Sequence, residues 1–182
     1  MQPIKQLSQL LDNLADAENY LFALDDLRSA LPDAGSESFK ALLSRAQKSG
    51  ILKRVCRGIY LYQRVDYPAG HVLFHTAVKL RSNAFNYLSL ESVLSDAGVI
   101  SQIPLNWITL MSSGRSHIVD CGDFGHIEFI HTKRKPDDVA HQLTYDRERR
   151  LWRASVTLAL LDMKLTRRNT DLVDWSLADE LV

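Results

Sequence analysis

Residues Gly50–Tyr62 read G-I-L-K-R-V-C-R-G-I-Y-L-Y, and this stretch decides the fold predicted for the first part of the chain. Residues that favour β-strands stand on both sides of Arg57-Gly58, where the glycine can take the positive φ that a tight turn needs. We therefore expect a β-hairpin that carries Lys53, Arg54 and Arg57 as clustered cations.

A helix is predicted over residues 36–49, directly before this hairpin. Its apolar residues recur at helical spacing, with Ser36 as N-cap and Gly50 as the residue that ends it; they are Phe39, Leu42, Leu43 and Ala46. Two amphipathic helices are expected before it, one from Ile4 to near Glu18 and one from Leu24 to Leu31, with Tyr20-Leu21-Phe22 as a link. Three helices followed by a basic hairpin are typical of a winged helix-turn-helix.

Charge is unevenly distributed around this region. Residues 38–65 hold seven Lys or Arg and no Asp or Glu, whereas residues 12–37 hold seven acids and a single base, Arg28. Each phosphate neutralised by a cation contributes roughly −0.9 to the logarithmic salt slope of duplex binding, so about five such cations bind duplex DNA strongly at low salt. The alternative is an ordinary solvated charged face.

The apolar side of helix 36–49 leaves a polar side for DNA. We expect this side to enter the major groove, the serines at its start to contact phosphates, and Arg57 to reach an adjacent backbone or minor groove. No Asn, Gln or Arg stands at the middle of the outward side, so affinity is predicted more firmly than base specificity. The predicted DNA-binding residues are Ser36, Ser38, Lys40, Ser44, Arg45, Lys48, Lys53, Arg54 and Arg57.

The composition is that of an ordinary soluble chain. The 182 residues have 46% hydrophobic content and zero net charge, which allows one domain or two small ones. The first residues lack a secretory signal and no apolar run is long enough for a membrane span, so we expect a cytoplasmic protein. Cys56 and Cys121 stand in unrelated contexts and are expected to be free thiols. The segment 66–70 contains Pro and Gly, which predicts a first domain of residues 1–66 and a second of residues 67–182.

The second domain is predicted to be a small α+β domain with a short antiparallel sheet. Helices are expected over residues 71–80 and 89–97, the latter opened by Ser89, and strands over residues 107–111, 116–119 and 126–130. The apolar segment from Leu151 to Met163 is interpreted as helical, and the tail from Asn169 to Val182 is expected to pack back on this domain.

Four segments together resemble the AbiEi antitoxins of type IV toxin-antitoxin systems. They occur in the expected order and span most of the chain: G-I-L-K-R-V-C-R-G-I-Y-L-Y (50–62), N-Y-L-S-L-E-S-V-L-S-D-A-G-V-I (86–100), I-P-L-N-W-I-T-L-M (103–111) and A-L-L-D-M-K (159–164). The Tyr-Leu-Ser segment followed by a Gly and a Pro-led strand is the more specific part.

The resemblance implies a repressor of its own operon that binds inverted repeats in double-stranded operator DNA through the winged domain. It also implies a C-terminal domain that counteracts a nucleotidyltransferase-like toxin, without a stable complex between the two proteins. No enzymatic activity, cofactor or metal is expected.

Other readings of the sequence remain open. The winged domain could dock a protein, with an incidental basic patch. A magnesium-dependent nuclease could use Asp120, Glu128 and Lys133, although their spacing differs from that of compact nuclease sites. Pairs of possible metal ligands also occur without a third ligand, so ordinary surface or core histidines are favoured; the pairs are His71 with His75, His117 with Cys121, and His126 with His131.

Overall fold

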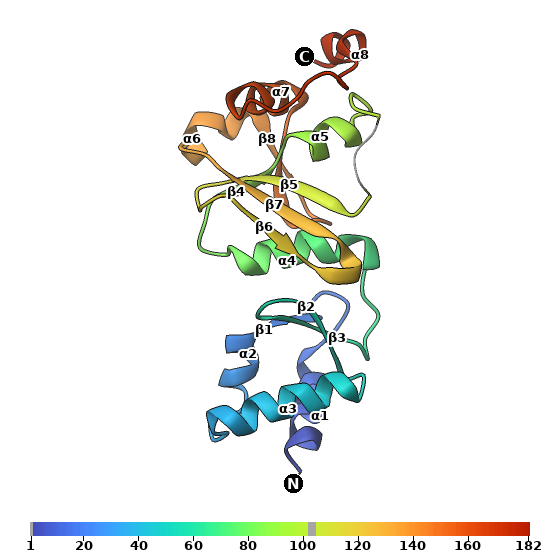
Figure 1. Ribbon diagram of the computed structural model, residues 1–182, viewed down its shortest axis with the longest axis vertical. Coiled ribbons are helices and arrows are strands. Elements are labelled where there is room, and N and C mark those ends of the chain that lie inside the picture. The colour runs from blue at the N-terminus through green and yellow to red at the C-terminus, as the bar shows by residue number, and fades with distance from the viewer. Residues whose placement is uncertain (1, 102–104) are drawn as a thin grey trace. The chain divides into compact units, whose positions relative to one another are not determined.

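The structure, a computed structural model, describes residues 2–101 and 105–182 and is mixed α+β (Figure 1). The chain divides into two compact units, the first extending to Val72 and the second covering Leu73–Val182. The division falls beyond the expected position after residue 66. Tyr67 explains part of this difference, because its ring stacks on Tyr20 of the first unit with centroids 5.2 Å apart.

Unit 1 consists of three helices and a three-stranded antiparallel sheet of order β1-β3-β2. Its elements are α1 (Pro3–Leu14), β1 (Leu21–Ala23), α2 (Leu24–Ser29), α3 (Ser36–Lys48), β2 (Leu52–Cys56) and β3 (Ile59–Tyr62). α1 ends before the predicted Glu18 because the Asp16 carboxylate accepts the amides of Glu18 and Asn19 in a local turn. The expected link at Tyr20 leads instead into β1, which pairs with β3.

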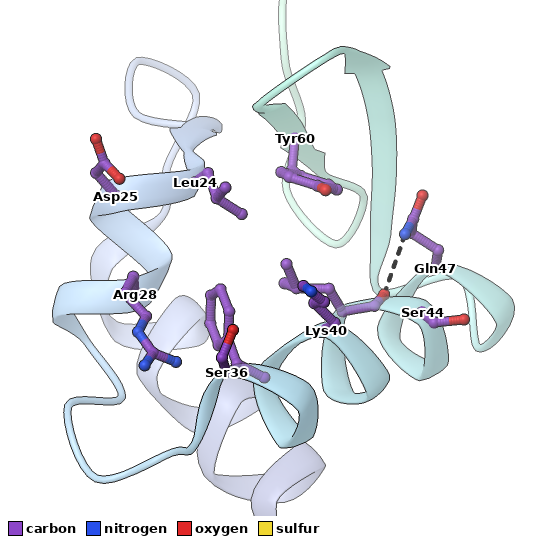
Figure 2. A pocket seen from close by; sticks show the side chains of 10 residues that line it. Leu24, Asp25, Arg28, Ser36, Lys40, Ser44, Gln47 and Tyr60 are labelled. Carbon is purple, nitrogen blue, oxygen red and sulfur yellow. Dashed lines mark hydrogen bonds between the residues drawn. The ribbon is translucent and has the colours of Figure 1, made fainter.

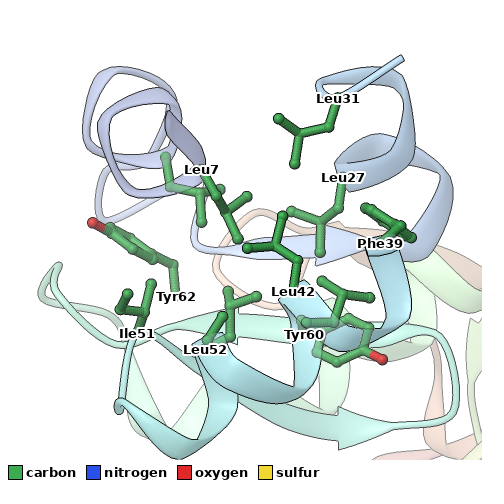
Figure 3. Packing of buried hydrophobic residues seen from close by; sticks show 12 residues of the cluster. Leu7, Leu27, Leu31, Phe39, Leu42, Ile51, Leu52, Tyr60 and Tyr62 are labelled. Atoms are coloured by element: carbon green, nitrogen blue, oxygen red, sulfur yellow. The ribbon is translucent and has the colours of Figure 1, made fainter. Parts of the chain in front are cut away.

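A single hydrophobic core joins the helices of unit 1 to this sheet (Figure 3). α3 contributes the four residues that the sequence pattern placed inside, and all four are buried. Leu7 and Leu11 of α1 and Leu27 of α2 meet them, with Leu52 and Tyr62 from the hairpin. The predicted orientation of α3 is therefore confirmed, and its polar side faces outward.

The junction between α3 and β2 is a hydrogen-bonded helix stop. The Ile51 amide donates to the Ala46 carbonyl and the Gly50 amide to the Gln47 carbonyl, which is the Schellman arrangement. Gly50 has φ +71°, a left-handed conformation that costs a residue with a side chain about 1–2 kcal/mol. Gly58, with φ +82°, provides the predicted turn between β2 and β3.

Unit 2 is built on a six-stranded sheet of order β6-β7-β5-β4-β9-β8. Figure 1 shows α4 on one side of this sheet and α5 and α7 on the other. The strands are β4 (Asn86–Leu88), β5 (Trp107–Ser112), β6 (His117–Asp120), β7 (His126–His131), β8 (Leu143–Asp146) and β9 (Leu151–Ala154). The main helices are α4 (Val72–Leu80), α5 (Glu91–Asp96), α6 (Pro136–Val139), α7 (Val156–Leu165) and α8 (Trp175–Leu181), with short 3₁₀ turns at Gly122–Phe124 and Ala140–Gln142. A further 3₁₀ turn at Ala69–His71 lies at the end of unit 1.

The prediction of a short antiparallel sheet in the second domain was wrong. β5 pairs in parallel with β7, and β4 in parallel with β9, so the sheet is mixed. The reason lies in burial: β7 buries Ile127 and Phe129 and therefore lies beside the buried β5, whereas β6 is largely exposed and forms the edge. The predicted strand positions themselves agree with β5, β6 and β7.

The segment from Leu151 to Met163 is a strand followed by a helix, not a single helix. β9 ends at Ala154, and the Ser155 hydroxyl then accepts the Leu158 amide as the N-cap of α7. A continuous apolar run has no periodicity by which strand and helix can be separated. α8 contacts α7, as expected for the tail. Within the described ranges, no helix combines the length and apolar character needed to cross a bilayer.

We expect Gly50→Ala to destabilise unit 1 by about 1–2 kcal/mol, because alanine is strained at a positive φ. Urea unfolding followed by far-UV circular dichroism measures the loss. All three tryptophans lie in unit 2, so their fluorescence provides an internal reference that should not change. The matched control is Gly70→Ala, where φ is not positive and the added methyl meets open space. An equal loss in both variants would contradict this account of the helix stop.

Candidate nucleic-acid interface

The polar side of α3 brings six of the predicted DNA-binding residues onto one exposed helix. The apolar stripe of α3 is turned into the core, so every residue between the buried positions points to solvent or to the helix flanks. All six side chains are exposed: Ser36, Ser38, Lys40, Ser44, Arg45 and Lys48.

The start of α3 differs from the prediction by one residue. Gly35, not Ser36, is the N-cap, and no side chain accepts a first-turn amide there. Pro32 restricts the start of the preceding turn, and the extended Gly35 lets the helix begin at Ser36 itself. The first-turn amides are therefore left to solvent or to an anion, the usual partner at a helix N-terminus.

The cations of α3 differ in what they contact. Lys40 Nζ lies 2.9 Å from Glu37 Oε1, but both side chains are well exposed, so the pair contributes little. In the described part of the chain, Arg45 and Lys48 form no ion pair. Two cations on this helix are thus available to an incoming polyanion, and a third is held only by a weak exposed pair.

The β2–β3 hairpin adds three more of the predicted cations. Arg57 is exposed at the turn beside Gly58, and Arg54 is exposed on β2 with its Nε donating to the Cys56 carbonyl at 3.3 Å. Lys53 is half-buried, which makes it the least accessible of the predicted residues. A register shift between Arg54 and Cys56 bends β2 just before the turn.

A pocket of about 450 Å³ lies beside α3 and was not anticipated from the sequence. Figure 2 shows Leu24 and Arg28 of α2, Tyr60 of β3 and the flank of α3 around it. The one feature of the sequence that could have indicated this pocket is Arg28, which is the sole base of an acidic stretch. Gln47 lines this pocket and donates to the Leu43 carbonyl at 3.3 Å, so it is turned away from the outward side of α3.

In unit 2, a buried carboxylate joins three of the segments on which the family resemblance rests. Asp162 is 0% exposed and accepts hydrogen bonds from Ser89 Oγ at 2.7 Å, from Tyr87 Oη at 3.1 Å and from Arg134. Thr109 Oγ1 in turn donates to the Ser89 carbonyl at 2.7 Å. Ser89 therefore does not open a helix, as the sequence suggested, but binds α7. Ile103 and Pro104 of the third segment lie outside the described residues.

Burial controls the ionisation of this cluster. It raises the pKa of Asp162 above the ordinary value, against the hydrogen bonds from Ser89 and Tyr87 and the charge of Arg134, which favour the ionised form. Burial also raises the pKa of Tyr87, and the neighbouring Asp162 charge adds to the effect. The tyrosine therefore stays a neutral hydrogen-bond donor.

The residues of the nuclease hypothesis are not brought together as a magnesium site. Glu128 is held by both terminal nitrogens of Arg168, at 2.9 and 3.0 Å, and by the Trp107 indole nitrogen at 3.1 Å. Burial opposes its charge, but the hydrogen bonds and charge of Arg168 lower the pKa of Glu128 overall. Arg168 also donates to Glu91. Asp120 instead accepts the Gly122 amide in its own turn.

The candidate metal-binding pairs have other contacts. His75 Nε2 lies 2.7 Å from the Glu148 carbonyl, His131 Nδ1 lies 2.9 Å from the Gly114 carbonyl, and the His126 ring stacks on Trp107. Cys56 and Cys121 are both buried thiols, one in each unit. Over residues 2–101 and 105–182, no three His, Cys, Asp or Glu side chains converge as a metal site requires.

These elements define the chain as an α+β protein with a helical, three-stranded first unit and a mixed-sheet second unit. No family model and no curated protein matches it. Among solved structures, it is similar to the RV2827C protein from Mycobacterium tuberculosis, with a TM-score of 0.59 and 14% identity over 92% of this chain. The chain covers 63% of that protein. At this identity the similarity concerns the fold alone.

We expect Tyr87→Phe to destabilise unit 2 by about 2 kcal/mol, because it removes a buried hydrogen bond to a carboxylate. This bond favours the ionised form of Asp162, so the loss should be largest at neutral pH and should shrink as the pH falls through the raised pKa of Asp162. Urea unfolding followed by tryptophan fluorescence measures it. The matched control is Tyr145→Phe, which changes an exposed tyrosine of the same sheet. A loss independent of pH would contradict the assigned role of the bond.

Proposed function

We propose that this chain is a DNA-binding antitoxin that represses its own operon in the cytoplasm. Unit 1 acts as a winged helix-turn-helix on double-stranded operator DNA with inverted repeats. Unit 2 counteracts a nucleotidyltransferase-like toxin without forming a stable complex with it. The observation that carries the DNA-binding part is the exposed basic side of α3 followed directly by the hairpin with Arg57 at its turn.

The order and pairing of elements support the winged domain. α1, α2 and α3 precede a two-stranded hairpin, and β1, between the first two helices, pairs with β3 of that hairpin. The Gly50 stop sends the chain from α3 into β2 across only three residues. In this class of domain the last helix enters the major groove while the hairpin turn reaches the neighbouring backbone.

The use of the acidic residues supports the same surface. Asp12 accepts a hydrogen bond from Tyr62, Asp16 accepts amides of its own loop, and Asp26 accepts the Ala23 amide at the start of α2. On α3 itself, Glu37 pairs with Lys40, and both side chains are exposed. Arg45 and Lys48, which form no ion pair in the described residues, keep their charge for phosphates.

The same side chains favour contacts to the backbone over contacts to bases. The outward centre of α3 presents Ala41, Ser44 and Lys48 and no Asn, Gln or Arg, the side chains that most often read bases in a bidentate way. Gln47 is turned to the flank. We infer that specificity depends on the spacing of inverted repeats and on DNA shape more than on base contacts by α3.

The antitoxin role of unit 2 rests on the resemblance to the AbiEi family. The resembling segments meet at Asp162, Tyr87, Ser89 and Thr109, inside the unit. These residues hold β4, β5 and α7 together. We infer that they form the framework of unit 2, and that exposed residues around it act on the toxin.

The decisive experiment is an electrophoretic shift of the purified protein on the DNA immediately upstream of its own gene, titrated against salt with random duplex as competitor. A shift that survives the competitor and falls steeply with salt is expected. Absence of any specific shift at low salt would overturn the repressor role and favour protein docking by unit 1 instead.

Arg57→Ala should weaken binding to every duplex and reduce the magnitude of the salt slope by about one unit, because one phosphate contact is lost. Fluorescence anisotropy at several salt concentrations measures both quantities. Arg147→Ala, which removes an exposed arginine of unit 2, is the matched control and should leave both unchanged. If Arg57→Ala behaved like the control, the hairpin turn would not be part of the interface.

A further inference from the structure

We propose that the pocket beside α3 binds a small amphipathic anion, a carboxylate or phosphate attached to an apolar body. Its volume of about 450 Å³ is within the range of small-molecule sites. Its walls combine apolar side chains with a few converging polar groups, which is the usual composition of such sites. The apolar walls are Leu24, Phe39, Leu43 and the ring of Tyr60.

The anionic part of the ligand is argued from Arg28. Its guanidinium lies 5.0 Å from the Phe39 ring centroid, which holds it against the pocket wall. Its Nη1 atom is buried and has no hydrogen-bond partner in the described residues. Arg28 as a whole is only half-buried and lines the pocket, and a guanidinium pairs best with a carboxylate or phosphate.

Two further donors lie at the same end of the pocket. Ser36 lines it, and the first-turn amides of α3 have no capping side chain. In Figure 2, Arg28 and Ser36 lie together at one end, while Gln47 lies at the other. Lys40 adds a cation at the rim, shared with Glu37. Asp25 also lines the pocket and is exposed, so it excludes an anion from its own side and directs the head group to Arg28.

Occupation of this pocket should affect DNA binding. Ser36, Lys40 and Ser44 line the pocket and are also proposed DNA contacts. An anion held among them repels phosphates and occupies the same donors. This consequence rests on the proposed function, whereas ligand binding itself does not.

The test uses the full chain with octanoate as the probe, followed by displacement of the fluorescent dye anilinonaphthalene sulfonate. Octanoate should displace the dye, octyl phosphate should do the same, and octanol or inorganic phosphate alone should be at least about tenfold weaker. Equal displacement by octanol would overturn the role of the charge. Equal displacement by inorganic phosphate would reduce the site to a simple anion site and overturn the apolar part.

Arg28→Met should weaken octanoate binding about tenfold or more, since it removes the guanidinium that lines the pocket. Arg45→Met, the same substitution on the opposite flank of α3, is the control. Leu24→Ser gives a second test, because Leu24 is a partly exposed pocket wall whose loss should weaken octanoate but not phosphate. Circular dichroism verifies that each variant folds. Equal weakening by Arg28→Met and Arg45→Met would place the dye on the basic side and overturn the proposal.

A final measurement separates the two proposals. Saturating octanoate should raise the Kd for duplex DNA severalfold in the unsubstituted protein, and the same concentration should have a much smaller effect in Arg28→Met. If the protein bound no DNA, the displacement experiment would still decide whether the pocket binds the anion. If octanoate bound without changing DNA affinity, the coupling would be wrong while the binding site remained.

Discussion

Burial of the apolar side of α3 is the constraint on which unit 1 depends. Each large side chain of that helix stabilises the fold by roughly 1.5–3 kcal/mol when buried, whereas an exposed ion pair such as Lys40 with Glu37 contributes at most about 1 kcal/mol. The core therefore fixes the rotation of the helix about its axis, and this rotation places the charged side chains at the surface. Once Phe39 and Leu42 are inside, Lys48 and Arg45 have no position except the surface.

The hairpin obeys the same constraint through Gly50. Ile51 must reach the core directly after α3, and only a left-handed residue between them allows so abrupt a reversal. β2 then starts against the helix that it follows, and its turn exposes Arg57. One conformational requirement at one glycine thus connects the packing of the core to the position of Arg57.

The sequence predicted unit 1 well because its signals are local. The apolar spacing of α3, Gly50 and Gly58 each act within a few residues, and each was confirmed. Ser36 was misplaced by one position, since a serine next to a glycine leaves two possible N-caps. β1 was missed because three residues carry too little pattern, and only pairing with the distant β3 makes them a strand. The pocket could not be predicted, since it depends on how α2 packs beside α3.

Unit 2 was predicted less completely because its order depends on long-range pairing. Parallel neighbours such as β5 with β7 leave no turn signal in the sequence, and the apolar run at Leu151 fits both a strand and a helix. Asp162 is instructive here. A single acid within an apolar helix has no obvious local role, and only the fold brings it to Tyr87 and Ser89, 75 and 73 residues away.

The two units use buried charge in different ways, and this difference bears on function. In unit 2, Asp162 and Glu128 are each satisfied by an arginine and by neutral donors, so these clusters have little capacity for a further ligand. In unit 1, the half-buried Arg28 lies over the Phe39 ring, and its buried Nη1 atom is unpaired in the described residues. Unsatisfied buried charge is destabilising unless a ligand repays it. The helix that presents its outer side to phosphates thus has, on its flank, a pocket lined by an arginine with a buried, unpaired nitrogen. A ligand in this pocket would contact the same helix that carries the proposed DNA contacts. Its effect on DNA binding would therefore need no movement of the core.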